Sequence, residues 1–197
     1  MEIDISINSS NNTAIDFELV FRILNDELAL HNEFLKLICA GGYVLQLNGY
    51  RGTNDVDAFF KSNITIENII HKVGDAFGIN KPDELWLNNS IANMNSEPLD
   101  KYCKIVYQFS NLVVLAVDLI YLVGMKLKSA RGQDIRDVSE IIKNTKNLQP
   151  FELLKTLDGM GFTIDVSILL DAYGEAHGME WLEEFYIMHE QEISKFF

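Results

Sequence analysis

The feature that most constrains the fold is a glycine pair after an apolar run, followed a short way on by two alternating aspartates. Residues 34–40 are strongly apolar and predict a buried strand, which Gly41 and Gly42 end. Asp55 and Asp57 are separated by a single residue in a second predicted strand, so both carboxylates project from one face. Adjacent carboxylates repel unless a cation compensates them, and oxygen ligands of this kind suit Mg²⁺ or Mn²⁺. The spacing therefore predicts a divalent-metal site beside a glycine turn.

Each half of this pattern also has an ordinary explanation. A Gly-Gly pair alone is most often a tight turn, and an isolated Asp-x-Asp is most often a solvated strand face at a sheet edge. The combination is more specific, because glycine lets a phosphate approach backbone N–H groups closely while the carboxylates hold the cation that accompanies the phosphate. We therefore interpret the two halves as one site for metal and phosphate.

The periodicity of the apolar residues predicts a mixed first part and an all-helical second part. Strands are predicted at residues 34–40, 55–60, 103–109 and 112–117, the last two as a hairpin. Helices are predicted near residues 16–31, 43–47, 66–77, 118–130, 134–145, 150–160, 165–176 and 178–195. Asp16 and Thr65 are expected N-caps, and Pro150 fits the first turn of its helix. We expect an α+β core over residues 1–120 and a helical C-terminal region over 121–197 packed on it.

The composition is that of a globular protein. Apolar residues make up 48% and aromatic residues 11%, which excludes a disordered chain. No apolar run reaches the roughly 18 residues needed to span a bilayer, and the longest is broken by Asp118. Residues 1–6 are acidic and lack the basic start of a signal peptide, which favours a cytoplasmic protein. Cys39 and Cys103 lie in apolar segments, as small buried residues do, and the histidines are too scattered to suggest zinc.

The charge is strongly negative and uneven. A net charge of −13 argues against a protein that holds nucleic acid by bulk electrostatics. Residues 151–197 carry ten acids and two lysines, whereas eight of the sixteen basic residues lie between Lys101 and Lys146. The acidic segment is either a solvated helical surface or one that docks a basic partner or masks a basic groove.

The glycine pair, the spacer and the aspartates resemble the motif of the nucleotidyltransferase (DNA polymerase β-like) superfamily. Residues 51–57, Arg-Gly-Thr-Asn-Asp-Val-Asp, are similar to the R-x-T-x-D-apolar-D stretch of bacterial minimal nucleotidyltransferases related to the abortive-infection AbiEii toxins. Residues 84–88 resemble a Trp-Leu-Asn element of that group. Residues 126–137 resemble its K-apolar-x-small-x-R-x-R-D-x-x-D helix pair, except that Gln133 stands where the family often has a second Arg. The resemblance implies a nucleotidyltransferase-fold mixed sheet with flanking helices, followed by a helical region.

The resemblance also implies roles for the residues of the first motif. Asp55 and Asp57 would bind Mg²⁺ or Mn²⁺, and the metal would clamp a nucleotide triphosphate during an in-line displacement. Gly41 and Gly42 would hold phosphate oxygens through their backbone N–H groups. Gly42 stands where many members have Ser, which removes a hydroxyl contact to the phosphates.

Four other residues are implied to bind nucleotide. Arg51 would pair with a phosphate unless it is an exposed loop residue, and Thr53 would touch the nucleotide unless it caps the turn before the strand. Lys126 and Arg131 are five residues apart and do not share a helix face closely, but both can reach one groove. A surface lysine whose stem packs on apolar neighbours explains Lys126 equally well.

Besides Asp55 and Asp57, the acids Asp118 and Asp137 are predicted to be catalytic. Asp118 follows the predicted strand 112–117 and is the best positioned residue for the third acid that many superfamily members use. Asp134 and Asp137 face the same way on one predicted helix, and an acid here is a candidate general base in the related toxins. The ordinary alternatives are a helix-capping Asp134 and a salt-bridged Asp137.

Three interpretations of function follow from these residues. The first is an active nucleotidyltransferase that moves a nucleotide monophosphate from a triphosphate to RNA, protein or a small molecule, as the toxin of a toxin–antitoxin or phage-defence pair with a cognate antitoxin. The second is a catalytically silent nucleotidyltransferase fold that acts as a partner-binding module. The third is a plain helical interaction protein with an accidental motif, which the clustering of the motifs in one short stretch argues against.

Overall fold

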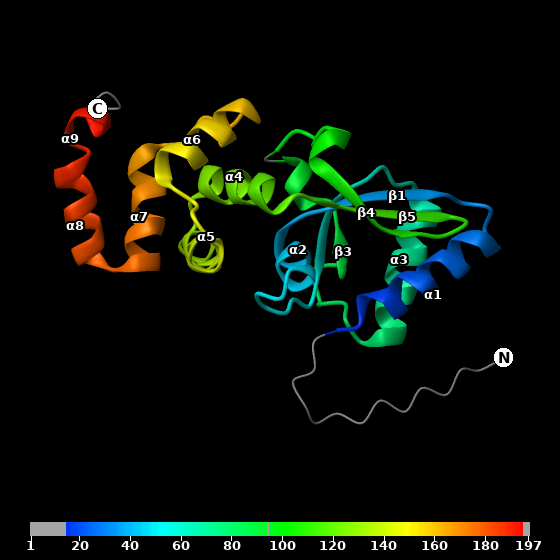
Figure 1. Ribbon diagram of the computed structural model, residues 1–197. Helices are drawn as coiled ribbons and strands as arrows, with labels where there is room; N and C mark the ends of the chain where they lie inside the picture. The colour runs from blue at the N-terminus through cyan, green and yellow to red at the C-terminus, as the bar shows by residue number, and fades with distance from the viewer. Residues whose placement is uncertain (1–14, 94, 195–197) are drawn as a thin grey trace.

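A five-stranded mixed sheet forms the first part of the molecule (Figure 1). The computed structural model describes residues 15–93 and 95–194. The strands are β1 (Leu35–Cys39), β2 (Val56–Phe59), β3 (Leu87–Asn88), β4 (Cys103–Gln108) and β5 (Leu112–Val117), in the sheet order β3-β2-β1-β5-β4. β1 is antiparallel to β2 and parallel to β5, β3 is parallel to β2, and β4 and β5 form the predicted hairpin. The expected α+β class is confirmed, and β3 is a strand that the periodicity did not predict.

Two of the three helices in this part cover one face of the sheet. The helices are α1 (Phe17–Leu30), α2 (Gly41–Leu47) and α3 (Ile64–Phe77). α1 and α3 share one apolar cluster with alternate strand side chains, as expected where one sheet face is buried. Asp16 caps α1 as predicted, accepting hydrogen bonds from the Glu18 and Leu19 N–H groups. The prediction that Thr65 caps α3 is wrong: the helix already includes Thr65, and Asn63 Oδ1 accepts from Ile66 N–H at 2.9 Å.

The second part is helical and extends away from one end of the sheet (Figure 1). Its helices are α4 (Leu119–Ser129), α5 (Gly132–Asn144), α6 (Pro150–Gly159), α7 (Val166–His177), α8 (Met179–Met188) and α9 (Glu190–Ile193). Pro150 occupies the first turn of α6, as predicted. The single helix predicted over residues 178–195 is instead two helices, because the backbone at His189 leaves the helical region with φ −120° and ψ 23°.

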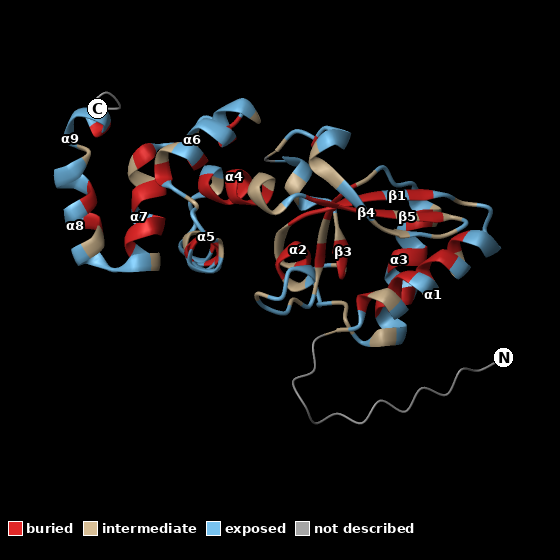
Figure 2. Ribbon diagram, in the orientation of Figure 1, coloured by how far each residue is buried: buried red, intermediate tan, exposed pale blue. Residues whose placement is uncertain are grey.

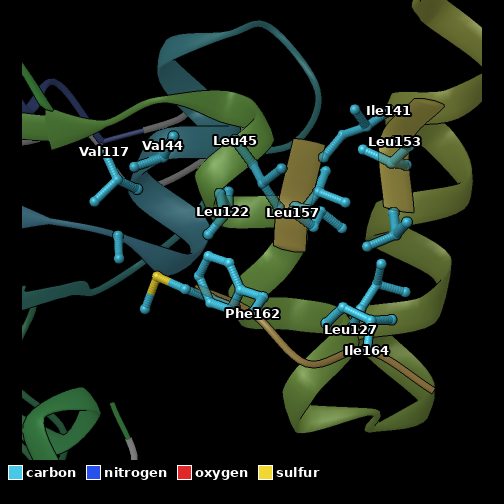
Figure 3. Packing of buried hydrophobic residues seen from close by; sticks show 14 of the residues in the cluster. Val44, Leu45, Val117, Leu122, Leu127, Ile141, Leu153, Leu157, Phe162 and Ile164 are labelled. Carbon is cyan, nitrogen blue, oxygen red and sulfur yellow. The ribbon is translucent and has the colours of Figure 1, made fainter. Parts of the chain in front are cut away.

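One hydrophobic cluster joins the sheet to the helices (Figure 3). Val117 at the end of β5 belongs to the same cluster as Leu122 of α4 and Phe162, which follows α6. Gly124 lets the Phe162 ring lie directly on α4, since a Cβ there would collide with that ring. The division into 1–120 and 121–197 stays a prediction, and the side chains on its two sides pack together.

Burial follows this arrangement: buried residues lie on β1, β2 and β5 and on one side of most helices, whereas none of the described residues of the edge strand β4 is buried (Figure 2). Burial raises the pKa of the Cys39 thiol and raises that of Cys103 to about 11, so neither is an acidic thiol. In the part of the chain that the structure describes, no helix combines the length and apolarity needed to cross a bilayer. Residues 1–6, on which the expected compartment rests, lie outside the described residues.

Candidate functional site

The glycine turn and Asp57 are packed against each other. The Ala40 N–H donates a hydrogen bond to the carbonyl oxygen of Asp57 at 2.8 Å, across the β1–β2 pair. Gly41 has φ +59°, and a Cβ there would collide with the Asp57 carboxylate. At Gly42 a Cβ would lie 2.7 Å from Thr53 Oγ1. The aspartate motif itself therefore requires both glycines, and the fold brings the two sequence motifs together.

Asp55 already has partners on both carboxylate oxygens. Thr53 Oγ1 donates to Oδ1 at 2.9 Å, and Lys81 Nζ lies 2.6 Å from Oδ2 and 3.1 Å from a Glu84 carboxylate oxygen. Burial alone would raise the pKa of Asp55, but the hydrogen bonds from Lys81 and Thr53 lower it. Burial, followed by the charge of Asp55, raises the pKa of Asp57. The negative charge of Asp57 is therefore the less well compensated of the two.

Helices α4 and α5 bring a network of ion pairs to the same place. Arg51 binds Asp137 in bidentate fashion, through Nε at 2.8 Å and Nη2 at 2.9 Å. Lys126 is 6% exposed, and its Nζ lies 2.8 Å from Asp134 Oδ1 and 2.7 Å from Asp137 Oδ2. Arg131 Nε lies 2.7 Å from Asp134 Oδ2, although 73% of the Arg131 side chain is exposed. Lys126 is thus a buried, paired lysine, and Arg131 keeps much of its guanidinium accessible.

Two cavities share Gly41, Asp57, Lys126, Arg131 and Asp134. We call them the cationic lobe, where three cations lie beside three carboxylates, and the neutral lobe, whose unshared lining is uncharged among the described residues. The cationic lobe, of about 250 Å³, is lined by Gly41, Gly42, Arg51, Thr53, Asp55, Asp57, Lys126, Arg131, Gln133 and Asp134. The neutral lobe, of about 280 Å³, is lined by Gly41, Asp57, Ser90, Ile91, Asn95, Leu122, Met125, Lys126, Ser129, Arg131 and Asp134. The cationic lobe therefore gathers every residue that the sequence predicted to bind metal or nucleotide.

The carboxylate pair suits a hard divalent cation that completes its coordination with substrate. Among residues 15–93 and 95–194, no three His, Cys, Asp or Glu side chains converge to form a protein cage for a metal. Mg²⁺ is commonly held by one or two carboxylates and takes its other ligands from phosphates and water. Asp55 and Asp57 form such a pair, and a cation would relieve the repulsion between them. The residues present therefore fit Mg²⁺ or Mn²⁺.

A protein-family model described as a nucleotidyltransferase of unknown function (DUF6036) matches residues 17–157. The chain belongs to this nucleotidyltransferase family. The matched segment contains the whole sheet, both lobes and the ion-pair network, and it ends within α6. No curated protein and no solved structure matches the chain. The likeness to AbiEii toxins therefore rests on the sequence motifs.

In this member of the family, Asp137 is salt-bridged, which is the alternative to the predicted catalytic role. Oδ1 accepts hydrogen bonds from Arg51 and Gln133, and Oδ2 accepts from Arg51 and Lys126. Burial alone would raise the pKa of Asp137, but these hydrogen bonds hold it at about 2. A carboxylate with two hydrogen bonds on each oxygen is a poor proton acceptor and a good anchor for cations. Gln133, where the family often has Arg, is one of the donors that fix this anchor.

Asp118, the predicted third acid, directly follows β5, and its catalytic role stays a prediction. It is exposed at the carboxyl end of β5, and its charge contributes to the raised pKa of Cys103 on β4. β1 lies between β5 and β2, so the end of β5 is two strands away from Asp57. Among the described residues, Asp118 lines neither lobe. The prediction was based on position along the chain, which differs from the order of strands in the sheet.

The residue beside Asp57 on the neighbouring strand is Asn88. The two are partners in the β2–β3 register. Asn88 Oδ1 accepts hydrogen bonds from the Ser90 N–H at 3.1 Å and the Ser90 hydroxyl at 2.5 Å, and Ser90 Oγ lies 3.5 Å from Asp57 Oδ1. The Trp-Leu-Asn element pointed to this segment, but a strand of two residues is too short for periodicity to reveal it. Strand β3 thus places the Asn88 amide beside Asp57, and the short helix Ser90–Asn93 that follows it adds the Ser90 hydroxyl.

Proposed function

We propose that this protein is a metal-dependent nucleotidyltransferase that moves a nucleotide monophosphate from a triphosphate to an acceptor hydroxyl. The observation that carries this proposal is the cationic lobe, where Asp55 and Asp57 share one cavity with Lys126 and Arg131. Carboxylates alone would repel a triphosphate, and cations alone would accept any anion. The two together favour a phosphate chain that arrives with a divalent cation. The family match supports the same class of reaction.

The residues of the first motif divide the work of binding. Mg²⁺ or Mn²⁺, when bound at Asp55 and Asp57, would neutralise the charge that develops on the phosphates. Gly41 and Gly42 line the cationic lobe and would offer their backbone N–H groups to phosphate oxygens. The absence of a Cβ at both positions lets Asp57 and Thr53 pack against this turn. Thr53 donates to Asp55, so we assign it the orientation of that carboxylate.

The cations of the lobe differ in how firmly they are held. Arg51 and Lys126 are fixed by Asp137 and would present a preformed positive wall to the phosphates. Arg131 is bonded only through Nε at 2.7 Å and weakly through Nη2 at 3.5 Å, both to Asp134. Its exposed guanidinium can therefore donate to a triphosphate that enters the lobe.

The likeness of residues 51–57 and 126–137 to AbiEii-type toxins supports a biological setting for this activity. We propose that the protein acts in the cytoplasm as the toxin of a toxin–antitoxin or phage-defence pair, with a cognate antitoxin as its partner. RNA, a protein or a small molecule is the acceptor in enzymes of this kind.

Transfer of label from nucleotide triphosphates labelled at the α-phosphate tests the proposed activity. With Mg²⁺, cellular RNA and cellular protein present, we expect labelled product with the wild type and none with Asp55→Ala/Asp57→Ala. Asp158→Ala/Asp171→Ala is the matched control, because it removes two exposed acids from the helical part. Equal labelling by the wild type and the Asp55/Asp57 variant would refute the proposal.

A catalytically silent fold that binds a partner is the second candidate function. It is favoured by Asn88, which occupies the strand position beside Asp57, and by Gln133, which replaces a bidentate donor of phosphate contacts. A silent fold would bind neither Mg²⁺–ATP nor Mg²⁺–GTP, so saturable binding of either in a calorimeter would count against it.

A further inference from the structure

The two lobes differ in the chemistry of the walls that they do not share. The residues that line only the cationic lobe are Gly42, Arg51, Thr53, Asp55 and Gln133. Those that line only the neutral lobe are Ser90, Ile91, Asn95, Leu122, Met125 and Ser129. Within the described part of the chain, this second set contains hydroxyl, amide and apolar side chains and no charged one. The part of the neutral lobe that it does not share with the cationic lobe therefore suits an uncharged group with an apolar body and a polar end.

The geometry of nucleotidyl transfer relates the lobes to each other. The acceptor oxygen attacks the α-phosphorus from the side opposite the leaving pyrophosphate. Pyrophosphate is strongly anionic, so its place is the cationic lobe, beside Arg51 and Lys126. A phosphorus between the two lobes lies beside the residues that line both, which are Gly41, Asp57, Lys126, Arg131 and Asp134. An in-line attack then brings the acceptor from the neutral lobe.

We propose that the neutral lobe is the acceptor site and that it takes a hydroxyl side chain of a protein: Ser, Thr or Tyr. This inference rests on the proposed function and names its acceptor class. The side-chain oxygen forms a bond to the α-phosphorus, and the bond from that phosphorus to the bridging oxygen of pyrophosphate breaks. Pyrophosphate leaves with the electron pair, and the hydroxyl proton passes to solvent. The product is a protein with a nucleotide on its side-chain oxygen.

Charge and size favour a protein hydroxyl over the end of a polynucleotide. A nucleic-acid strand carries one phosphate per residue, and proteins that hold it line the groove with Lys and Arg. The only cations at the neutral lobe in the described structure are Lys126 and Arg131, which are shared with the cationic lobe and paired with Asp134. The net charge of −13 also repels a polyanion. A cavity of about 280 Å³ accommodates one side chain, with Ile91 against its apolar part.

Filling the neutral lobe tests whether it holds the acceptor. Ile91 is partly exposed on the short helix Ser90–Asn93, so Ile91→Trp and the milder Ile91→Phe enlarge a wall without altering the buried core. Ile105→Trp is the matched control, because Ile105 is 60% exposed on the edge strand β4. We expect Ile91→Trp to lower the labelling rate by about 10²-fold while Mg²⁺–nucleotide binding changes by less than about 2-fold. The control should change neither, and a loss of nucleotide affinity in both Ile91 variants would overturn the assignment of the lobe.

Digestion of the labelled product tests the acceptor class. Total soluble bacterial protein and total bacterial RNA are offered separately to the wild-type protein with α-labelled nucleotide triphosphates and Mg²⁺. We expect label that proteinase releases and ribonuclease does not. Label in RNA, or nucleotide binding without any labelled protein, would overturn the protein acceptor. Absence of nucleotide binding by the wild type would instead refute the proposed function itself, which distinguishes the two failures.

Discussion

The cationic lobe has two walls, which we call the sheet wall and the helix wall. Each contains two aspartates, but only those of the helix wall are both paired with cations of the protein. On the sheet wall, Asp55 and Asp57 repel each other, and the protein supplies one partly exposed cation, Lys81, to Asp55 alone. On the helix wall, Asp134 and Asp137 are paired with Lys126 and two arginines. The sheet wall therefore leaves carboxylate charge uncompensated, whereas each carboxylate of the helix wall has cationic partners.

This difference teaches which wall leaves charge for a ligand to compensate and which wall is already formed before a ligand arrives. A wall that leaves carboxylate charge uncompensated is costly for the free protein, so that cost indicates a ligand. A wall whose charges satisfy one another keeps its shape without a ligand, but loses stability when one partner is removed. Substitutions on the sheet wall should therefore abolish function and spare the fold, and substitutions on the helix wall should affect the fold first.

The largest expected effect is on transfer by Asp57→Asn. Removal of a residue that only orients a metal ligand costs about 10–100-fold, so loss of a ligand itself should lower the transfer rate by more than about 10²-fold. Stability should stay equal or rise, because burial and the charge of Asp55 both raise the pKa of Asp57. Label transfer and urea unfolding measure the two effects. A variant that keeps its transfer activity, or one that is strongly destabilised, would contradict the claim that the sheet wall serves function and not stability.

On the helix wall, Asp137→Ala should destabilise the protein by about 2–3 kcal/mol. The substitution leaves Lys126 buried with one carboxylate partner instead of two. Arg51 also loses its ion pair, but its side chain is 41% exposed, so hydration of the guanidinium offsets part of that loss. Urea unfolding gives the change in free energy, with the exposed acid Asp158→Ala as the control. A change no larger than that of the control would mean that the network contributes nothing to stability.

The sheet wall could be predicted from the sequence because its constraints are local. Alternation of side chains along a strand places Asp55 and Asp57 on one face wherever that strand lies in the sheet. A Cβ at Gly41 would clash with Asp57, and one at Gly42 would clash with Thr53. Because these residues belong to one short stretch of the chain, the glycine requirement is visible in the sequence motif. Periodicity likewise located the hairpin and most helices, because each buries one regular apolar face.

The remaining contacts could not be predicted because they depend on tertiary structure. Arg51 and Asp137 are 86 positions apart, and no local pattern pairs them. Lys81 lies in a turn and Asn88 in a strand of two residues, where periodicity carries no information. The separation of Asp118 from Asp57 likewise depends on the sheet, where β1 lies between β5 and β2 although it precedes both in the chain.

Acid should weaken the helix wall through Asp137. Its pKa is about 2 in the folded protein and about 3.9 when unfolded. Because the folded value is the lower one, the stabilisation is complete above about pH 4 and is lost as the pH falls toward about 2, by roughly 1–2 kcal/mol. Unfolding free energies of the wild type and Asp137→Asn, measured across this range, should converge at the acid end. Parallel curves would show that Asp137 does not carry this acid sensitivity.

The smallest expected effect is on the Mn²⁺ affinity of the sheet wall, through Lys81. Lys81 Nζ lies 2.6 Å from Asp55 Oδ2, so a divalent cation that uses this oxygen must displace the ammonium. Lys81→Met should therefore strengthen Mn²⁺ binding without nucleotide by about 5-fold, corresponding to the roughly 1 kcal/mol of an exposed ion pair. Titration of the Mn²⁺ electron paramagnetic resonance signal measures the affinity. Lys72→Met, which removes a surface ion pair with Glu27, is the matched control and should leave it unchanged. Weaker Mn²⁺ binding by Lys81→Met would show that the lysine supports the metal site, and the sheet wall would then be more complete than its charges indicate.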